Sequence, residues 1–253
     1  MSNLKSPILL LRGINSDSRY WLDFPDEFNS DIEILIVDLP GTGNNSSSKT
    51  PLSISQHVNF LRNQIHPDHL SQGLHIIGLS LGGMIAIQWL SMFPNEIKSV
   101  SAMSSTGGKF YSSITRINPI NWLKISLSMT LDKILRTKKF PKTLVSIVTH
   151  LPENNDRQNW IASRFSYLGN ENSVSIFSTL RQIIAAARWA PDFSHYAHLG
   201  KRVLLLKAKY DRFIPPKAVN RLHSMIPNSQ FNVSFTTANT YLDLGRLSPF
   251  GFK

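Results

Sequence analysis

The feature that most constrains this chain is a strand, a sharp glycine turn and a helix, which follow one another in HIIGLSLGGMIAIQWL at residues 75–90. The turn has the pattern Gly-x-Ser-x-Gly, with Ser80 between Gly78 and Gly82. Glycines are needed where the two backbones crowd together, and such a turn lifts the serine hydroxyl above the sheet. The pattern predicts a nucleophilic Ser80. The alternative is a glycine-rich turn whose serine caps the following helix.

Strand and helix patterns alternate on both sides of this turn. Apolar runs that end at Gly or Pro predict buried strands in SPILLLRG (6–13) and DIEILIVDLPG (31–41). The next segment has Ile54, Val58, Leu61 and Ile65 at helical spacing, which predicts a helix. This helix precedes another predicted strand, LHIIG at 74–78. Three later runs predict further strands, namely SVSAMSST (99–106), KRVLLLKAKYDRFIPP (201–216) and FNVSF (231–235). We expect an α/β fold with a mostly parallel sheet, helices on both faces, and functional loops at the carboxyl ends of the strands.

The 253 residues are enough for one domain with a sizeable core, interrupted by an insertion. We predict core segments at 1–108 and 199–253 and a helical cap at 109–198, where no comparable strand series occurs. Within the cap, five apolar residues form a helical stripe: Ile120, Leu123, Leu127, Leu131 and Ile134. The stripe predicts either a lid over the strand ends or packing against the sheet and neighbouring helices.

Composition excludes several classes of site. The chain has no cysteine, so it has no disulfide, thiolate zinc site or cysteine nucleophile. Its first apolar run is too short for a signal segment or a membrane span, and we expect a cytoplasmic location.

Much of the net charge of +11 comes from eight Lys and Arg residues between 109 and 142. This segment predicts a solvated helical face; weak contact with an anionic membrane surface and binding of an anionic substrate are the alternatives. No specific nucleic-acid binding is expected, since no nucleic-acid motif accompanies the charge.

Four segments together resemble the α/β-hydrolase family. ILLLRG is similar to the family's first oxyanion strand and turn, and DLPGTG to its D-x-P-G-x-G loop. GLSLGGMIAIQWLSMFPNEIKSV is similar to its nucleophile elbow and helix, and LLLKAKYDRFIPP to its acid-bearing strand end. The segments follow one another in the family's order. The likeness therefore extends over nearly the whole chain.

The resemblance implies a serine hydrolase for small or medium acyl esters that needs no metal or organic cofactor. Ser80 would attack the carbonyl carbon, and the backbone N–H groups of Ile14 and Leu81 would hold the oxyanion. Asp211, which follows a buried strand, would orient an imidazole. The alternative role for Asp211 is that of a turn residue before Pro215.

Arg12 stands at the oxyanion turn where the family more often has histidine, with Trp21 several residues further on, as in a group of bacterial members with Arg-Gly there. The donor at this turn is a backbone group, so the substitution need not harm catalysis. We expect Arg12 to pair with a nearby carboxylate in preference to binding substrate. Trp21 is a candidate wall of the acyl pocket, and plain packing is the equal alternative.

The family's general base is missing from its usual place. The family places a histidine after the last strand, but FNVSFTTANTYLDLG has none, and Thr240 occupies the equivalent position. Threonine cannot accept a proton near neutral pH. Only 13 residues follow Thr240, and we expect the family's C-terminal helix to be absent. A change of reading frame after about Gln230 would explain both losses, and translation of the other two frames tests this hypothesis.

Three histidines are candidates to replace the base: His150 in the cap and His195 and His198 where the cap rejoins the core. We expect structural or surface roles for the remaining five, His57, His66, His69, His75 and His223. The sequence thus predicts a serine hydrolase whose turnover is impaired by the missing base. The alternative is a non-catalytic protein that keeps the pocket for ligand binding or interaction.

Overall fold

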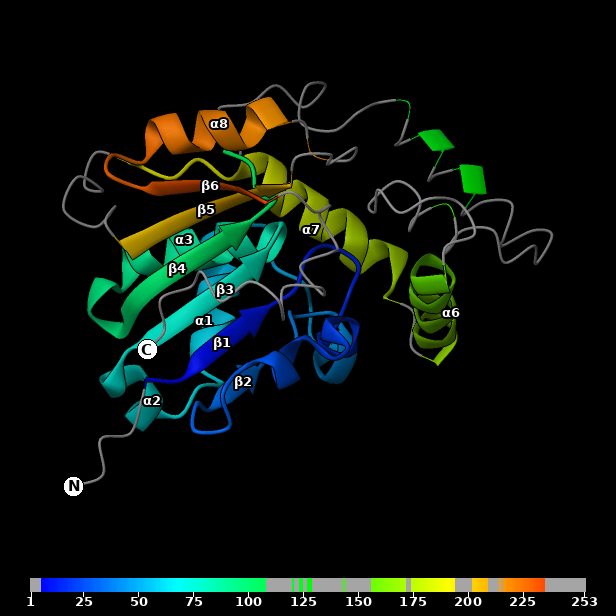
Figure 1. Ribbon diagram of the computed structural model, residues 1–253, viewed down its shortest axis with the longest axis horizontal. Helices are drawn as coiled ribbons and strands as arrows, with labels where there is room; N and C mark the ends of the chain where they lie inside the picture. The colour runs from blue at the N-terminus through cyan, green and yellow to red at the C-terminus, as the bar shows by residue number, and fades with distance from the viewer. Residues whose placement is uncertain are drawn as a thin grey trace.

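The computed structural model describes residues 6–107, 156–171, 174–193, 202–208 and 216–234, together with residues 120, 123, 124, 127, 128, 143 and 214. Its centre is a six-stranded sheet in the order β2-β1-β3-β4-β5-β6, and each neighbouring pair is parallel (Figure 1). The strands are β1 (Ile8–Leu11), β2 (Ile34–Ile36), β3 (Leu74–Leu79), β4 (Ile97–Met103), β5 (Val203–Ala208) and β6 (Gln230–Ser234). The predicted α/β class and parallel sheet are confirmed.

The strand order contains a reversal next to β1. After β1 the chain crosses to β2 on one side, and after β3 it crosses to β4 on the other side. The connections that leave β1 and β3 therefore run to opposite sides, and in open α/β sheets ligands bind at the carboxyl ends of the strands where such a reversal occurs. Ser80 follows β3 and Gly13 follows β1, so both lie at this reversal.

Helices cover one face of the sheet. The main apolar cluster joins alternate residues of β1 to helices α1 (Ile54–Arg62), α3 (Leu81–Met92), α7 (Ile176–Arg188) and α8 (Pro216–Met225). Helix α3 is buried on almost every side, which explains its nearly continuous apolar sequence. The predicted stripe Ile54, Val58, Leu61 and Ile65 is buried in this cluster.

A second apolar cluster lies on the opposite face. Ile8 and Leu10 of β1 pack there with Trp21 of the short helix η1 (Ser18–Trp21) and Phe24 of η2 (Phe24–Glu27). Because strand side chains alternate between faces, Arg12 continues the Ile8 and Leu10 row. Helix α6 (Asp156–Glu171) lies beyond the carboxyl ends of the strands (Figure 1) and packs on Tyr20 through Phe165.

The remaining short elements connect the main ones. They are η3 (Gly43–Asn45), α2 (Pro67–Gln72) and η4 (Pro94–Glu96). Among the described residues, no helix is long and apolar enough to cross a membrane.

Two expectations about apolar runs are corrected. The run at 31–41 gives only the three-residue strand β2, which is partly exposed because it lies at the sheet edge and pairs with β1 alone. Ile120, Leu123 and Leu127 of the cap stripe are each more than half exposed, so these three do not pack against the sheet. Leu131 and Ile134 lie outside the described residues.

Candidate functional site

Ser80 occupies a strained backbone conformation between β3 and α3. Its φ is 54° and its ψ is −111°, a region that residues other than glycine rarely enter. The backbone is held there from both sides: Ser80 N donates to Met103 O at 2.8 Å, and Ser105 Oγ donates to Ser80 O at 2.8 Å. Such strain persists only where surrounding contacts fix it, and it is often found at functional sites.

The glycines of the turn are required by close backbone approaches. A Cβ on Gly82 would lie 2.2 Å from Leu11 O, and a Cβ on Gly78 would lie 2.4 Å from the Gly82 carbonyl carbon. A Cβ on Gly83 would lie 2.0 Å from Ser105 Oγ. Helix α3 therefore begins in direct contact with the end of β1, which brings the Ser80 turn against the Arg12-Gly13 turn.

The Ser80 side chain does not cap the helix. Ser80 is the residue before α3, yet its hydroxyl makes no capping hydrogen bond. The alternative role of Ser80 as a helix cap is therefore wrong. Its side chain instead lies beside Gly13, where a Cβ would be 3.3 Å from Ser80 Cβ and 3.8 Å from Ser80 Oγ.

The two predicted oxyanion donors flank this contact. Leu81 is the fully buried first residue of α3, and Ile14 is the partly buried residue after Gly13. The structure thus brings both residues next to Ser80 in the fold. Their role as N–H donors to an oxyanion remains a prediction.

A polar framework holds the loop that carries Gly13 and Ile14. Asn15 has a φ of 57°, and its N–H donates to Oε1 of Gln182 on α7 at 3.0 Å. Ser16 Oγ donates to Gly13 O at 3.0 Å. The buried Asp38 carboxylate accepts hydrogen bonds from Ser18 Oγ and from Asn44 N, which joins this loop to the one after β2.

Sequence reasoning missed Ser105 and Gln182. Gln182 is fully buried. It is a lone polar residue on the apolar face of α7 that also carries Ala185, Ala186 and Trp189, and this pattern could have indicated a buried polar role for it. Ser105 gave no comparable signal, because its bond to Ser80 O depends on the pairing of β3 with β4.

Arg12 and Trp21 lie together beside the turn that follows β1. The Arg12 guanidinium carbon lies 5.0 Å from the centre of the Trp21 ring, and Trp21 stacks on Phe24. Burial lowers the pKa of Arg12 to about 10, although the charges of Tyr20 and Asp17 oppose this shift. Burial also raises the pKa of the Tyr20 phenol.

The expected carboxylate partner of Arg12 is taken by another cation. Asp17 Oδ1 accepts from Arg19 Nε at 2.9 Å, and Asp17 Oδ2 accepts from Arg19 Nη2 at 2.8 Å. Arg12 itself makes no ion pair with any carboxylate in the described part of the chain. The expectation that Arg12 pairs with a carboxylate is therefore wrong for these residues. The side chain of Trp21 is 1% exposed and belongs to the second apolar cluster, which favours the alternative of plain packing. Its role as a pocket wall stays a prediction.

The five histidines expected to be structural or exposed all have local partners. His57 Nδ1 donates to Ser53 O, and burial lowers its pKa. His75 bonds Ser99 Oγ, and burial also lowers its pKa.

The other three histidines have local contacts. His66 caps α2, and His69 contacts Glu33. His223 bonds Ser229 Oγ and stacks on Phe231. The expectation for all five is confirmed.

No described side chain accepts the Ser80 proton. Within the described ranges, Ser80 Oγ has no hydrogen-bond partner among the histidines, lysines or carboxylates. Asp211, Thr240, His150, His195 and His198 lie outside the described residues. No cluster of metal-binding side chains occurs among the residues that the structure describes.

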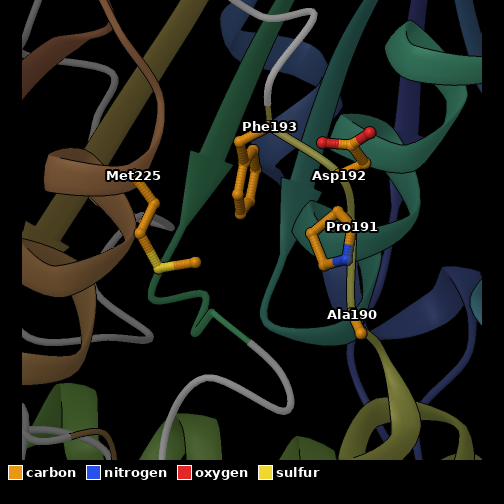
Figure 2. Close-up of a pocket in the computed structure, with 5 residues that line it drawn as sticks. All are labelled: Ala190, Pro191, Asp192, Phe193 and Met225. Atoms are coloured by element: carbon orange, nitrogen blue, oxygen red, sulfur yellow. The ribbon is translucent and has the colours of Figure 1, made fainter.

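A surface pocket occurs whose lining does not include Ser80. It has a volume of about 490 Å³ and is lined by Ala190, Pro191, Asp192, Phe193 and Met225. Figure 2 shows Phe193, from the segment after α7, and Met225 of α8 on opposite sides of the space. Neither Ser80 nor the Arg12-Gly13 turn contributes to its lining, so we do not assign it to the candidate site.

Comparisons with known proteins identify the fold. A model described as alpha/beta hydrolase fold matches residues 6–238. RutD from Shigella flexneri serotype 5b (strain 8401), whose name describes a candidate carbamate hydrolase, is 22% identical over 234 residues, which cover 88% of this chain and 80% of RutD.

Two solved structures share the fold. A serine hydrolase from Cycloclasticus zankles has a TM-score of 0.70 at 19% identity and covers 96% of this chain and 87% of its own. The 2-hydroxy-6-oxo-6-phenylhexa-2,4-dienoate hydrolase from Rhodococcus sp. strain RHA1 has a TM-score of 0.68 at 18% identity, with coverage of 94% and 85%. At these identities the likeness establishes the fold alone.

Proposed function

The chain belongs to the α/β-hydrolase fold family, and we propose that it hydrolyses carboxylic acyl esters through Ser80. The observation that carries this proposal is the Ser80 turn. The serine is held at a φ of 54°, leaves α3 uncapped, and lies beside the Gly13 turn at the strand reversal. A hydroxyl in this position, between two backbone turns that offer N–H groups, suits attack on a carbonyl carbon.

In the proposed first step, Ser80 Oγ attacks the carbonyl carbon while its proton leaves for a base. The carbonyl oxygen becomes an oxyanion, which the N–H groups of Leu81 and Ile14 stabilise. The C–O bond to the alcohol then breaks, the alcohol takes up the proton, and an acyl group remains on Ser80. Water attacks this ester in the second step, which releases the acid and restores the hydroxyl. Asp211 is the proposed orienting acid of the same site.

The carbonyl class is also supported by the relatives. The name of RutD describes a carbamate hydrolase, and carbamates and esters share a carbonyl carbon that bears a heteroatom leaving group. An acyl ester is therefore the chemically simplest probe substrate for this chain. The cytoplasmic location that its sequence predicts is part of the same proposal, consistent with the absence of cysteine.

We expect slow turnover, since Thr240 stands at the position of the base. In another serine enzyme, removal of the base costs about 10⁶ in turnover, while about 10³ to 10⁴ over water remains from the oxyanion hole and binding. The proposed activity is thus one that depends on Ser80 yet is far below that of a complete triad.

Hydrolysis of a short activated acyl ester by the wild-type chain, Ser80→Ala and Thr240→His tests this proposal. We expect a slow wild-type rate that disappears in Ser80→Ala and rises by more than about tenfold in Thr240→His, because a positioned base contributes about 10² to 10⁴. A wild-type rate that survives Ser80→Ala would refute the role of Ser80.

The second candidate function is ligand binding without catalysis. It is favoured by one observation, that Ser80 Oγ has no proton acceptor among the described residues. A wild-type chain without Ser80-dependent turnover that still binds carboxylic acids or esters would support this second function.

A further inference from the structure

Arg12 is a buried cation that has no hydrogen-bond partner in the described part of the chain. Its side chain is 8% exposed, and its Nε is buried with no partner among the described residues. Its pKa, lowered by burial to about 10, still leaves it charged at neutral pH. A buried charge is unfavourable unless it is paired, so this guanidinium needs a compensating group.

The charge of Asp17 raises the pKa of Arg12, but neither neighbouring carboxylate forms an ion pair with its guanidinium. Both oxygens of Asp17 accept hydrogen bonds from Arg19. Asp38 accepts hydrogen bonds from Ser18 and Asn44. The loops around Arg12 therefore contain two buried acids that are bonded to other groups, while the buried cation forms no ion pair with any described residue.

Arg12 is also next to the candidate nucleophile. It directly precedes Gly13, and a Cβ on Gly13 would lie 3.8 Å from Ser80 Oγ. The Arg12 carbonyl packs on the start of α3, since a Cβ on Gly82 would lie 2.7 Å from Arg12 O. The backbone that carries the guanidinium is thus fixed against the Ser80 turn.

The surroundings of the guanidinium suit a planar anion. The Trp21 ring covers it at 5.0 Å, and Tyr20 is the neighbour of Trp21 in the short helix η1. Because burial raises the pKa of Tyr20, its phenol stays neutral and remains a hydrogen-bond donor. A guanidinium fork matches a carboxylate in plane, and removal of water strengthens the attraction between them.

We propose that Arg12, with Tyr20 and Trp21, forms a carboxylate-binding subsite beside Ser80, so that the preferred acyl substrate also carries a free carboxylate. The substrate part of this inference rests on the proposed function of Ser80. The binding part does not depend on catalysis, and the two are tested separately.

Calorimetric titration of the full chain with sodium butyrate and with butyramide tests the binding part at constant ionic strength. The two probes have similar shape and differ in charge. We expect butyrate to bind at least about tenfold more tightly than butyramide, a difference typical of charge-assisted hydrogen bonds. Equal binding of the two probes, or tighter binding of inorganic phosphate than of butyrate, would overturn the carboxylate assignment.

The variant Arg12→Met links this binding to the guanidinium. We expect butyrate affinity to fall by about tenfold or more while butyramide binding stays the same. Arg12→Lys keeps a positive charge without the planar guanidinium, so its butyrate affinity should fall less than that of Arg12→Met. Arg62→Met is the matched control, because Arg62 also lies over an aromatic ring, Phe93, at 4.5 Å but is paired with Glu96. Wild-type butyrate binding by both Arg12 variants would overturn the proposal.

Thermal unfolding separates a binding role from a merely structural one. Replacement of an unpaired buried charge by an apolar side chain is often neutral or stabilising, so Arg12→Met should melt at the same temperature as the wild type or higher. A clearly lower melting temperature with unchanged butyrate affinity would instead make Arg12 a structural partner of Trp21.

Ser80→Ala separates the subsite from the proposed function. We expect it to bind butyrate as the wild-type chain does, because the subsite does not need the hydroxyl. A chain that binds butyrate through Arg12 but shows no Ser80-dependent turnover would keep the subsite and refute the hydrolase. Turnover of a neutral ester through Ser80 without any binding of butyrate would keep the hydrolase and refute the subsite.

Discussion

At the scale of single residues, the strain at Ser80 is maintained by neighbours that have no side chain. Gly78, Gly82 and Gly83 each lie where an added Cβ would approach another atom to within 2.5 Å. A larger residue at Gly78 or Gly82 must move the start of α3 or the end of β1, and with them the relation between Ser80 and Gly13. A larger residue at Gly83 must move Ser105, which is bonded to Ser80 O. The glycines are thus required for the position of Ser80 as well as for the turn.

Gly82→Ala tests this requirement. Its Cβ would lie 2.2 Å from Leu11 O, so we expect a loss of stability of about 1–3 kcal/mol, as for overpacked cores, with loss of Ser80-dependent turnover. Gly107→Ala is the matched control, since its Cβ would meet Met225 Sδ at an ordinary 3.5 Å. Chemical denaturation measures both, and equal stability of the two variants would contradict the close packing described for the turn.

His57 predicts a dependence of stability on pH. Burial lowers its pKa in the folded chain below the ordinary 6.5, so the unfolded chain takes up the proton first as pH falls. Stability is therefore complete above about pH 6.5 and is lost below it, by up to about 1.4 kcal/mol per pH unit for one proton. His75 is shifted in the same direction and adds to the trend.

Denaturation of the wild-type chain and His57→Leu between pH 7.5 and 5 checks this sign. We expect the slope of unfolding free energy against pH to be smaller in His57→Leu, with the remaining slope partly due to His75. Equal slopes in the two proteins would mean that His57 titrates alike in the folded and unfolded chains.

At the scale of elements, helix α7 holds the loop that follows β1. Gln182 accepts the Asn15 N–H, and Thr179 Oγ1 donates to Asn15 Oδ1 at 3.0 Å. Arg181 Nε also donates to Thr50 O, in the segment after β2. A helix from the region predicted to be the cap is therefore bonded to the turn proposed to form the oxyanion hole.

Gln182→Leu tests this link. Loss of the acceptor leaves the partly buried Asn15 N–H without its partner, which costs about 0.5–1.5 kcal/mol, and the loosened turn should lower kcat more than it raises KM. Thr179→Val is the matched control, since it removes a more exposed bond to the same residue and should change either constant little. Comparable losses in the two variants would argue against a specific role of Gln182.

The main elements were predictable from local patterns. Apolar runs and helical spacing predicted β1, β3 and α1, because their buried side chains follow the periods of strand and helix. The partial exposure of β2 was not predictable, since it follows from an edge position that only the strand order reveals. The lack of an ion pair between Arg12 and the described carboxylates was likewise not predictable, because it depends on the pairing of Asp17 with Arg19.

At the scale of the whole molecule, the reversal of strand order next to β1 brings the site together. It places the turn after β1 against the turn after β3, although more than sixty residues separate Gly13 from Ser80. The Gly-x-Ser-x-Gly pattern indicated Ser80 as the candidate site residue. The family resemblance indicated that the turn after β1 lies next to it. The contacts of Ser105 and Gln182 arise only from the assembled sheet and α7, so no local pattern could give them.

The central claim is that Ser80 is a nucleophile toward acyl compounds, and covalent labelling tests it most directly. A fluorophosphonate forms a bond to a reactive serine oxygen with loss of fluoride, so intact mass and peptide mapping identify the site. We predict a single slow adduct on Ser80 that is absent from Ser80→Ala and forms faster in Thr240→His. An adduct of equal extent in Ser80→Ala, or none on the wild-type chain, would contradict the account.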